Sequence, residues 1–155
     1  MLRLSKMTDY GTVVLAALAV EPGSVHTSAE LAERTRLGLP TVSKLLKQLA
    51  KGGLVRSTRG AHGGYSLARR PANISAVEII DAIEGPVALT ECSVDENLCG
   101  LESSCGVGSS WQRINLAIRD ALKAITLETL CQADRAPIPE IRIDASRLFR
   151  SRASS

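Results

Sequence analysis

The first helix is predicted by an uninterrupted run of apolar residues. Residues 13–20 are all apolar, and Glu21-Pro22-Gly23 directly after them stops a helix. Thr8 or Asp9 can cap its start, so a helix is expected from about residue 8 to residue 20. The run is far shorter than the roughly 20 apolar residues of a membrane span, and it lacks the cleavage pattern of a secretory signal. A buried helix, no membrane association and a cytoplasmic location are therefore expected.

Two shorter helices follow the first one. Thr27 and Glu30 have the spacing of a capping box, which predicts a helix over residues 28–35. After a short turn, Pro40 suits the first position of a third helix, and Gly52-Gly53 ends that helix. The apolar positions of the third helix share one face: Val42, Leu45, Leu46 and Leu49.

A glycine-rich hairpin is predicted directly after the third helix. Residues 54–57 and 65–68 are strand-like and flank a loop, residues 58–64, that contains three glycines. Two short helices followed by such a hairpin make a winged helix-turn-helix, in which the second helix fits the major groove of DNA. Arg59 at the tip of the loop can reach a phosphate or a minor groove. A solvated hairpin without a ligand is the alternative.

The second half of the chain predicts two more helices. Ser75 and Glu78 form another capping box, and Gly85-Pro86 ends the helix that they begin. From residue 110 to residue 130, apolar residues recur at steps of three and four, which predicts one long amphipathic helix. This helix can fold back on its own domain or pair with a second copy, and we expect it to form a homodimer. Cys131, which follows it, is expected to pack as a small apolar residue.

Charge is divided unevenly along the chain, although the net charge is only +3. Residues 1–70 carry eleven Lys and Arg against four Asp and Glu, and residues 71–131 carry three against nine. A basic half favours binding to a polyanion. Aromatic residues are only 3% of the chain, which disfavours proteins that stack single-stranded bases. No catalytic constellation is recognisable, so neither an enzyme nor a small-molecule substrate is expected.

These observations divide the chain into three parts. Residues 1–70 are expected to be a winged-helix DNA-binding domain, and residues 71–131 a helix, a cysteine loop and the dimerisation helix. Residues 132–155 are expected to be an irregular tail, with residues 137–143 extended. The fold class is therefore mainly α with a small β-wing. Candidate base contacts are Thr41 and Ser43, and the candidate contacts to phosphates and to the wing's groove are Lys44, Lys47, Lys51, Arg56, Arg59, His62 and Gly63.

Three cysteines lie together in a polar stretch, residues 87–110. Cys92, Cys99 and Cys105 have the spacing C-x6-C-x5-C. In a reducing cytoplasm, thiols are more often ligands or redox groups than disulfides. Three thiolates suit a soft metal or an iron–sulfur cluster, and the C-x2-C pairs of structural zinc are missing. Redox thiols, a zinc site or three unrelated cysteines are the alternatives.

The sequence resembles the bacterial winged-helix regulators of the IscR and NsrR kind, which sense the status of iron–sulfur clusters. Within that family it is most similar to the regulators of the SUF cluster-assembly operon. The likeness is carried by residues 1–10, 29–55 and 59–69 and by the cysteine loop. It implies a homodimer that crosses through the long helix and regulates iron–sulfur assembly genes, with a two-iron or four-iron cluster on Cys92, Cys99 and Cys105.

The resemblance leaves the fourth ligand and the target sequence open. One branch of the family uses a His three residues after the last cysteine, where this chain has Gly108. The other branch uses an N-terminal aspartate of the partner subunit, and Asp9 matches that position, although it also suits the start of a helix. Some relatives place an acidic base-reading residue where this chain has Ser43. An iron–sulfur carrier or assembly scaffold without specific DNA binding is the alternative function.

Overall fold

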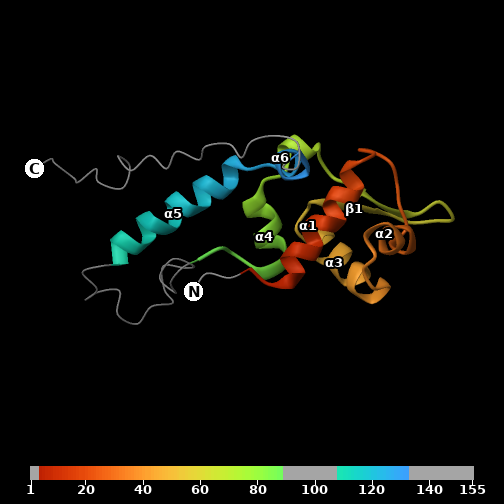
Figure 1. Ribbon diagram of the computed structural model, residues 1–155, viewed down its shortest axis with the longest axis horizontal. Helices are drawn as coiled ribbons and strands as arrows, with labels where there is room; N and C mark the ends of the chain where they lie inside the picture. The colour runs from red at the N-terminus through yellow and green to blue at the C-terminus, as the bar shows by residue number, and fades with distance from the viewer. Residues whose placement is uncertain (1–3, 89–107, 133–155) are drawn as a thin grey trace, which may run out of the picture.

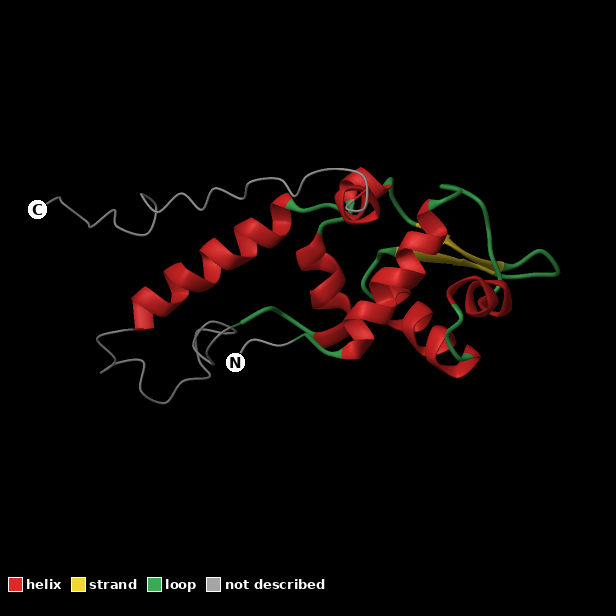
Figure 2. Ribbon diagram, in the orientation of Figure 1, coloured by secondary structure: helices red, strands yellow, loops and turns green. Residues whose placement is uncertain are grey.

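The computed structural model describes residues 4–88 and 108–132 of the chain. Within these residues the fold is mainly helical, with one antiparallel two-stranded hairpin, and Figure 2 shows this composition. The elements are α1 (Lys6–Ala19), α2 (Ser28–Thr35), α3 (Leu39–Lys51), β1 (Val55–Thr58), β2 (Gly64–Leu67), the 3-10 turn η1 (Pro71–Asn73), α4 (Ala76–Glu84), α5 (Gly108–Ala124) and α6 (Leu127–Gln132). The hairpin and α2 lie at one end of the molecule, and α5 extends from the other (Figure 1). The predicted fold class is confirmed.

Helix α1 begins earlier than the sequence predicted. Its N-cap is Ser5, whose hydroxyl accepts a hydrogen bond from the Met7 N–H at 3.2 Å, and neither Thr8 nor Asp9 caps it. Thr8 is instead buried, and Asp9 lies exposed in the first turn. The prediction missed this start because the residues before Thr8 are not part of the apolar run that defined the helix.

Helix α2 has the predicted ends, and helix α3 begins one residue earlier than predicted. The capping box of α2 is present: Thr27 Oγ1 accepts from the Glu30 N–H at 3.2 Å, and Glu30 Oε2 accepts from the Thr27 N–H at 2.7 Å. Arg36 takes a left-handed conformation (φ 56°) after α2 and turns the chain toward α3. Helix α3 begins at Leu39, so Pro40 is its second residue and not the first residue that the sequence predicted.

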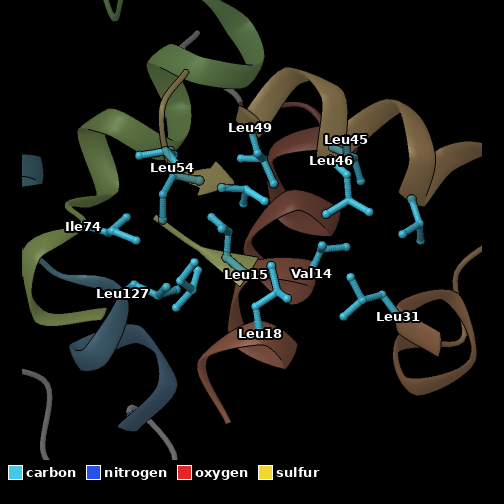
Figure 3. Packing of buried hydrophobic residues seen from close by; sticks show 14 residues of the cluster. Val14, Leu15, Leu18, Leu31, Leu45, Leu46, Leu49, Leu54, Ile74 and Leu127 are labelled. Carbon is cyan, nitrogen blue, oxygen red and sulfur yellow. The ribbon is translucent and has the colours of Figure 1, made fainter. Parts of the chain in front are cut away.

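One apolar core joins the helices. Figure 3 shows side chains of α1 at its centre, with those of α3 on one side and Ile74 and Leu127 on another. Burying apolar side chains against one another is the main favourable term in folding, so this core fixes how α1 and α3 cross. The fully buried large side chains include the predicted face of α3 and are Val14, Leu15, Leu18, Leu31, Val42, Leu45, Leu46, Leu49, Leu54, Ile74, Ile79 and Leu127.

Both strands of the hairpin are shifted by one residue from the predicted ranges. The register pairs Val55 with Leu67 and Thr58 with Gly64. Leu54 is excluded from the strand because its N–H donates to Leu49 O at 3.0 Å, which ties it to the end of α3. The hairpin therefore starts directly from the C-terminus of α3, and the two elements have a fixed relative position.

The predicted long helix is wrong, because it is broken at Ile125 and Thr126. The Ala76 N–H donates to Ile125 O and the Leu127 N–H donates to Ile74 O, both at 2.8 Å. These bonds pair the start of α4 with the α5–α6 junction in a short antiparallel bridge. The side chain of Thr126 then accepts from the Thr129 N–H and begins α6. The prediction missed the break because it followed the apolar stripe past Ile125, whereas Leu127, only two residues later, lies on the opposite face of that predicted helix and enters the core.

The last described helix also corrects the expectation for Cys131. Its side chain is exposed rather than packed in the core, because Leu127 is the residue of α6 that turns inward. Gln132 ends α6, and the rest of the expected tail lies outside the described residues. No helix in the described part of the chain is long and apolar enough to span a bilayer.

The packing of α3 predicts a sharp contrast between two leucines. Leu46→Ala should lower the free energy of unfolding by about 2–5 kcal/mol, because it removes a fully buried side chain and leaves a cavity. Leu39→Ala makes the same chemical change on the same helix, but Leu39 is 47% exposed and its loss should change stability by less than about 1 kcal/mol. Urea unfolding followed by circular dichroism measures both, and equal losses would contradict this packing.

Candidate nucleic-acid interface

The side of α3 that faces away from the core carries the predicted DNA-contacting residues. Thr41 and Ser43 are half-buried, whereas Lys44, Lys47 and Lys51 are exposed. This division follows from helix geometry, because the face defined by the buried leucines leaves the remaining positions on the outer side. The outer face of α3 therefore presents small hydroxyls beside long cationic side chains.

The cations of this surface are not neutralised by neighbouring carboxylates. Among the described residues, no salt bridge or side-chain hydrogen bond involves Lys44, Lys47, Lys51, Arg56 or Arg59. Elsewhere in the molecule, Arg69 is paired with Glu78 and Arg119 with Asp81, each at 2.8 Å. Unpaired cations repel one another, and a polyanion such as DNA relieves that repulsion. Hereafter these five residues are called the cationic surface.

The tip of the hairpin exposes Arg59 and His62. Gly63 has a different position: its N–H already donates to Gly60 O at 2.9 Å. A Cβ on Gly63 would lie 2.5 Å from Thr58 O and 2.9 Å from Gly60 O, so no larger residue fits without moving the loop. Gly63 therefore shapes the loop that presents Arg59, and its amide is engaged inside that loop.

The base of the hairpin is anchored by residues that the sequence did not single out. His26 and Tyr65 exchange two backbone hydrogen bonds, of 2.9 and 2.8 Å, which tie β2 to the loop before α2. Gly64 permits this approach, since a Cβ there would lie 2.5 Å from His26 O. The His26 side chain is buried, with Nε2 3.7 Å from a carboxylate oxygen of Glu21. Only the glycines of the loop could have indicated so close an approach.

At the other end of α1, Asp9 borders an apolar groove. The groove has a volume of about 510 Å³ and lies between α1, α4 and the α5–α6 junction, with Ile79, Ile80, Leu122 and Ile125 among its lining residues. The Asp9 carboxylate is exposed and has no hydrogen-bond or ion-pair partner among the described residues. It is therefore free to accept a ligand.

Two polar clamps hold the chain where it leaves α4 toward the cysteines. Glu84 accepts hydrogen bonds from the Ser5 N–H at 2.7 Å and from the Thr8 hydroxyl, which ties the end of α4 to the start of α1. Asp81 accepts from the Val87 N–H at 2.9 Å and from Arg119 at 2.8 and 3.2 Å. Arg119 belongs to α5, so the second clamp also fixes α5 against α4.

The three cysteines predicted as cluster ligands belong to residues 89–107. Cys92, Cys99 and Cys105 lie outside the described residues, and Asp9 is the only candidate ligand within them. Residues 4–88 and 108–132 contain no cluster of three or more His, Cys, Asp or Glu side chains suited to a metal. The donor chemistry still fits an iron–sulfur centre, because three thiols are available from one segment and an unpaired carboxylate from α1.

A helix-turn-helix, a hairpin fixed to its second helix and a cationic surface across both define a winged-helix DNA-binding protein. Residues 4–133 match the family model described as Rrf2, iron-dependent transcriptional regulator. The chain belongs to the Rrf2 family of DNA-binding transcriptional regulators.

Individual relatives agree with this assignment. The chain is 34% identical to the HTH-type transcriptional regulator CymR of Bacillus subtilis over 130 residues, which are 83% of this chain and 89% of the relative. The solved structure of CymR, the global cysteine regulator of B. subtilis, superposes with a TM-score of 0.64 at 32% identity and covers 86% of this chain and 98% of that one. The structure of T. potens IscR superposes with a TM-score of 0.61 at 30% identity and covers 86% and 89%.

The clamp at Glu84 predicts a dependence of stability on pH. Hydrogen bonds from Thr8 and Ser5 lower the pKa of Glu84 below its ordinary value of 4.5. The clamp therefore stabilises the fold fully above the ordinary pKa and is lost as the pH falls through the lower pKa of the folded state. We expect Glu84→Gln to flatten the acid loss of stability between about pH 6 and pH 3 in urea unfolding. An unchanged pH profile in this variant would contradict the clamp.

Proposed function

We propose that the protein is a homodimeric regulator whose binding to operator DNA responds to an iron–sulfur cluster. The observation that carries the DNA-binding part is the cationic surface, which has no internal partners in the described part of the chain. In this proposal α3 enters the major groove, and Thr41 and Ser43 contact base edges there. Lys44, Lys47, Lys51 and Arg56 contact phosphates, which hold the protein in position without reading sequence.

The wing completes the proposed contact with DNA. Arg59 and His62 are exposed in the loop between β1 and β2. A narrow minor groove attracts an inserted cation, and Arg59 is the cation at the hairpin tip. Gly63 contributes by shaping the loop that carries these two side chains. The His26–Tyr65 pairing holds the base of the hairpin against the loop that precedes α2.

The exposed apolar side chains of α5 support the proposed homodimer. Trp111 is 43% exposed, Ile114 39% and Leu116 60%, although all three are large apolar residues. An isolated exposed leucine is common, but several on one projecting helix favour an interface with another chain. A second copy of the same helix is the partner we propose, since two-fold dimers place two reading helices one turn of DNA apart.

The proposed cofactor is an iron–sulfur cluster on Cys92, Cys99 and Cys105, with Asp9 as the candidate fourth ligand. The family description as iron-dependent regulators and the likeness to IscR support this assignment. A bound cluster would make the protein sensitive to iron and to oxidants, because loss or oxidation of the cluster would free the side chains that hold it. Glu84 joins the end of α4, which precedes the cysteines in sequence, to the start of α1, which carries Asp9. Iron–sulfur assembly genes are the proposed targets.

A second candidate function is favoured by another group of relatives. The chain is also similar to CymR, described as a cysteine regulator, and to an oxidised form of Staphylococcus aureus CymR at 30% identity. In that alternative the three cysteines are redox thiols and no cluster is bound. An iron–sulfur carrier is a further alternative, and it predicts cluster transfer to other proteins without sequence-specific binding to duplex DNA.

The assignment of phosphate contacts predicts how one lysine changes DNA binding. Lys47→Ala should weaken binding to every duplex by a similar factor, because a phosphate contact carries no sequence information. The slope of log K against log salt should decrease by about 1. Lys123→Ala is the matched control, since Lys123 is an exposed lysine on α5, the helix that extends from the end of the molecule opposite the hairpin. Fluorescence anisotropy over a salt series measures DNA binding by both variants. An unchanged slope in Lys47→Ala would contradict a phosphate contact by Lys47.

The cluster proposal predicts the colour of the cysteine variants. Protein isolated without oxygen should absorb visible light and contain iron and acid-labile sulfide. Cys92→Ser, Cys99→Ser and Cys105→Ser should each remove that absorbance, because a cluster needs its thiolate ligands. Cys131→Ser should retain it, since Cys131 is an exposed thiol on α6. A colourless wild-type protein, or a coloured Cys99→Ser variant, would overturn the three-thiolate site.

A further inference from the structure

Leu39 is an apolar side chain on a surface that is otherwise polar and cationic. It is 47% exposed, whereas the other large apolar residues of α3 are completely buried. Its neighbours leave it accessible, because Gly38 has no side chain and Pro40 is itself exposed. Leu39 therefore contributes little to the core, and its position calls for another explanation.

The position of Leu39 places it beside the proposed base contacts. It is the first residue of α3, and Ser43 and Lys47 follow at steps of four residues. Residues four apart lie one above the other on a helix, so the three side chains form one stripe. Side chains in a helix also tilt toward its N-terminus. Leu39 thus extends the stripe beyond Ser43, at the end of the helix that meets base edges in helix-turn-helix proteins.

An apolar side chain at this place has one complementary group in the major groove of unmodified DNA. Most other major-groove groups of a base pair are hydrogen-bond donors or acceptors, and the C5-methyl of thymine is the only methyl group among them. We propose that Leu39 is a specificity-determining residue that selects a thymine in each half-site by packing on its methyl group. The inference rests on the proposed DNA-binding function and adds the base that one side chain of α3 recognises.

The expected size of the effect follows from burial of one methyl group. Removing a methyl from a buried apolar contact reduces affinity about fourfold. Ser43 and the lysines cannot replace the contact, because a hydroxyl and an ammonium group have no apolar surface at their ends. The preference for thymine over uracil at one position should therefore depend on Leu39.

The test combines a change in the protein with a change in the DNA. A binding site is first selected from random duplexes with the wild-type dimer, and each thymine in one half-site is then replaced by deoxyuridine. In the wild type, one replacement should weaken binding about fourfold. Leu39→Ala should bind thymine and uracil equally at that position, and Leu39→Met should restore the preference. Lys47→Ala should bind more weakly overall and keep the wild-type ratio of the two affinities.

Each result has a distinct meaning. A wild-type protein that selects no duplex sequence overturns the proposed function itself. A wild type that binds specifically but loses no affinity with any deoxyuridine overturns only the inference about Leu39. A Leu39→Ala variant that keeps the full preference for thymine also overturns only the inference about Leu39. Circular dichroism of Leu39→Ala checks that α3 is intact, and equal sensitivity to uracil in the folded variant would contradict the proposal.

Discussion

Burial of one face of α3 is the constraint that determines how the helix-turn-helix and the hairpin are arranged. Leu45, Leu46 and Leu49 are completely buried, and α1, α2 and α4 all pack on this helix. Rotating α3 about its axis would expose these leucines and bury lysines, and both changes are costly. The same packing that stabilises the protein therefore fixes which residues face outward. The end of α3 also positions the hairpin, through the bond between Leu54 and Leu49.

A second set of contacts joins this end to the rest of the chain. The start of α4 is held by its backbone bridge to Ile125 and Leu127, and the other end of α4 by Glu84. Arg119 then binds α5 to α4 through Asp81. Partly buried charged hydrogen bonds have stronger directional preference than apolar contacts. Helix α4 is thus the element through which the direction of α5 is set relative to α1 and α3.

Local chemistry explains which parts of the fold were predictable. Thr27 with Glu30, Pro40 and the glycines after Lys51 determine helix ends through contacts within a few residues, and the sequence predicted these ends to within one residue. The break before α6 depends on backbone bonds to Ile74 and Ala76, some fifty residues away in sequence, and its local sign is only that Leu127 lies out of phase with the apolar stripe. The pairing of His26 with Tyr65 was not predicted either, because its two partners are also far apart in the sequence. The exposure of Leu39 was equally invisible, since periodicity identifies the buried face but not which apolar residue stays outside it.

The geometry around α1 gives a physical basis for coupling the two halves of the molecule. Asp9 and the Thr8 hydroxyl lie within the first turn of α1, and Thr8 binds the residue that ends α4. Helix α1 also supplies Val14, Leu15 and Leu18 to the core that holds α3. Packed cores resist gradual deformation, so a displacement at the start of α1 is transmitted along the helix as a rigid shift. A ligand on Asp9 would therefore act on α3 through α1, with no need for a contact of its own near α3.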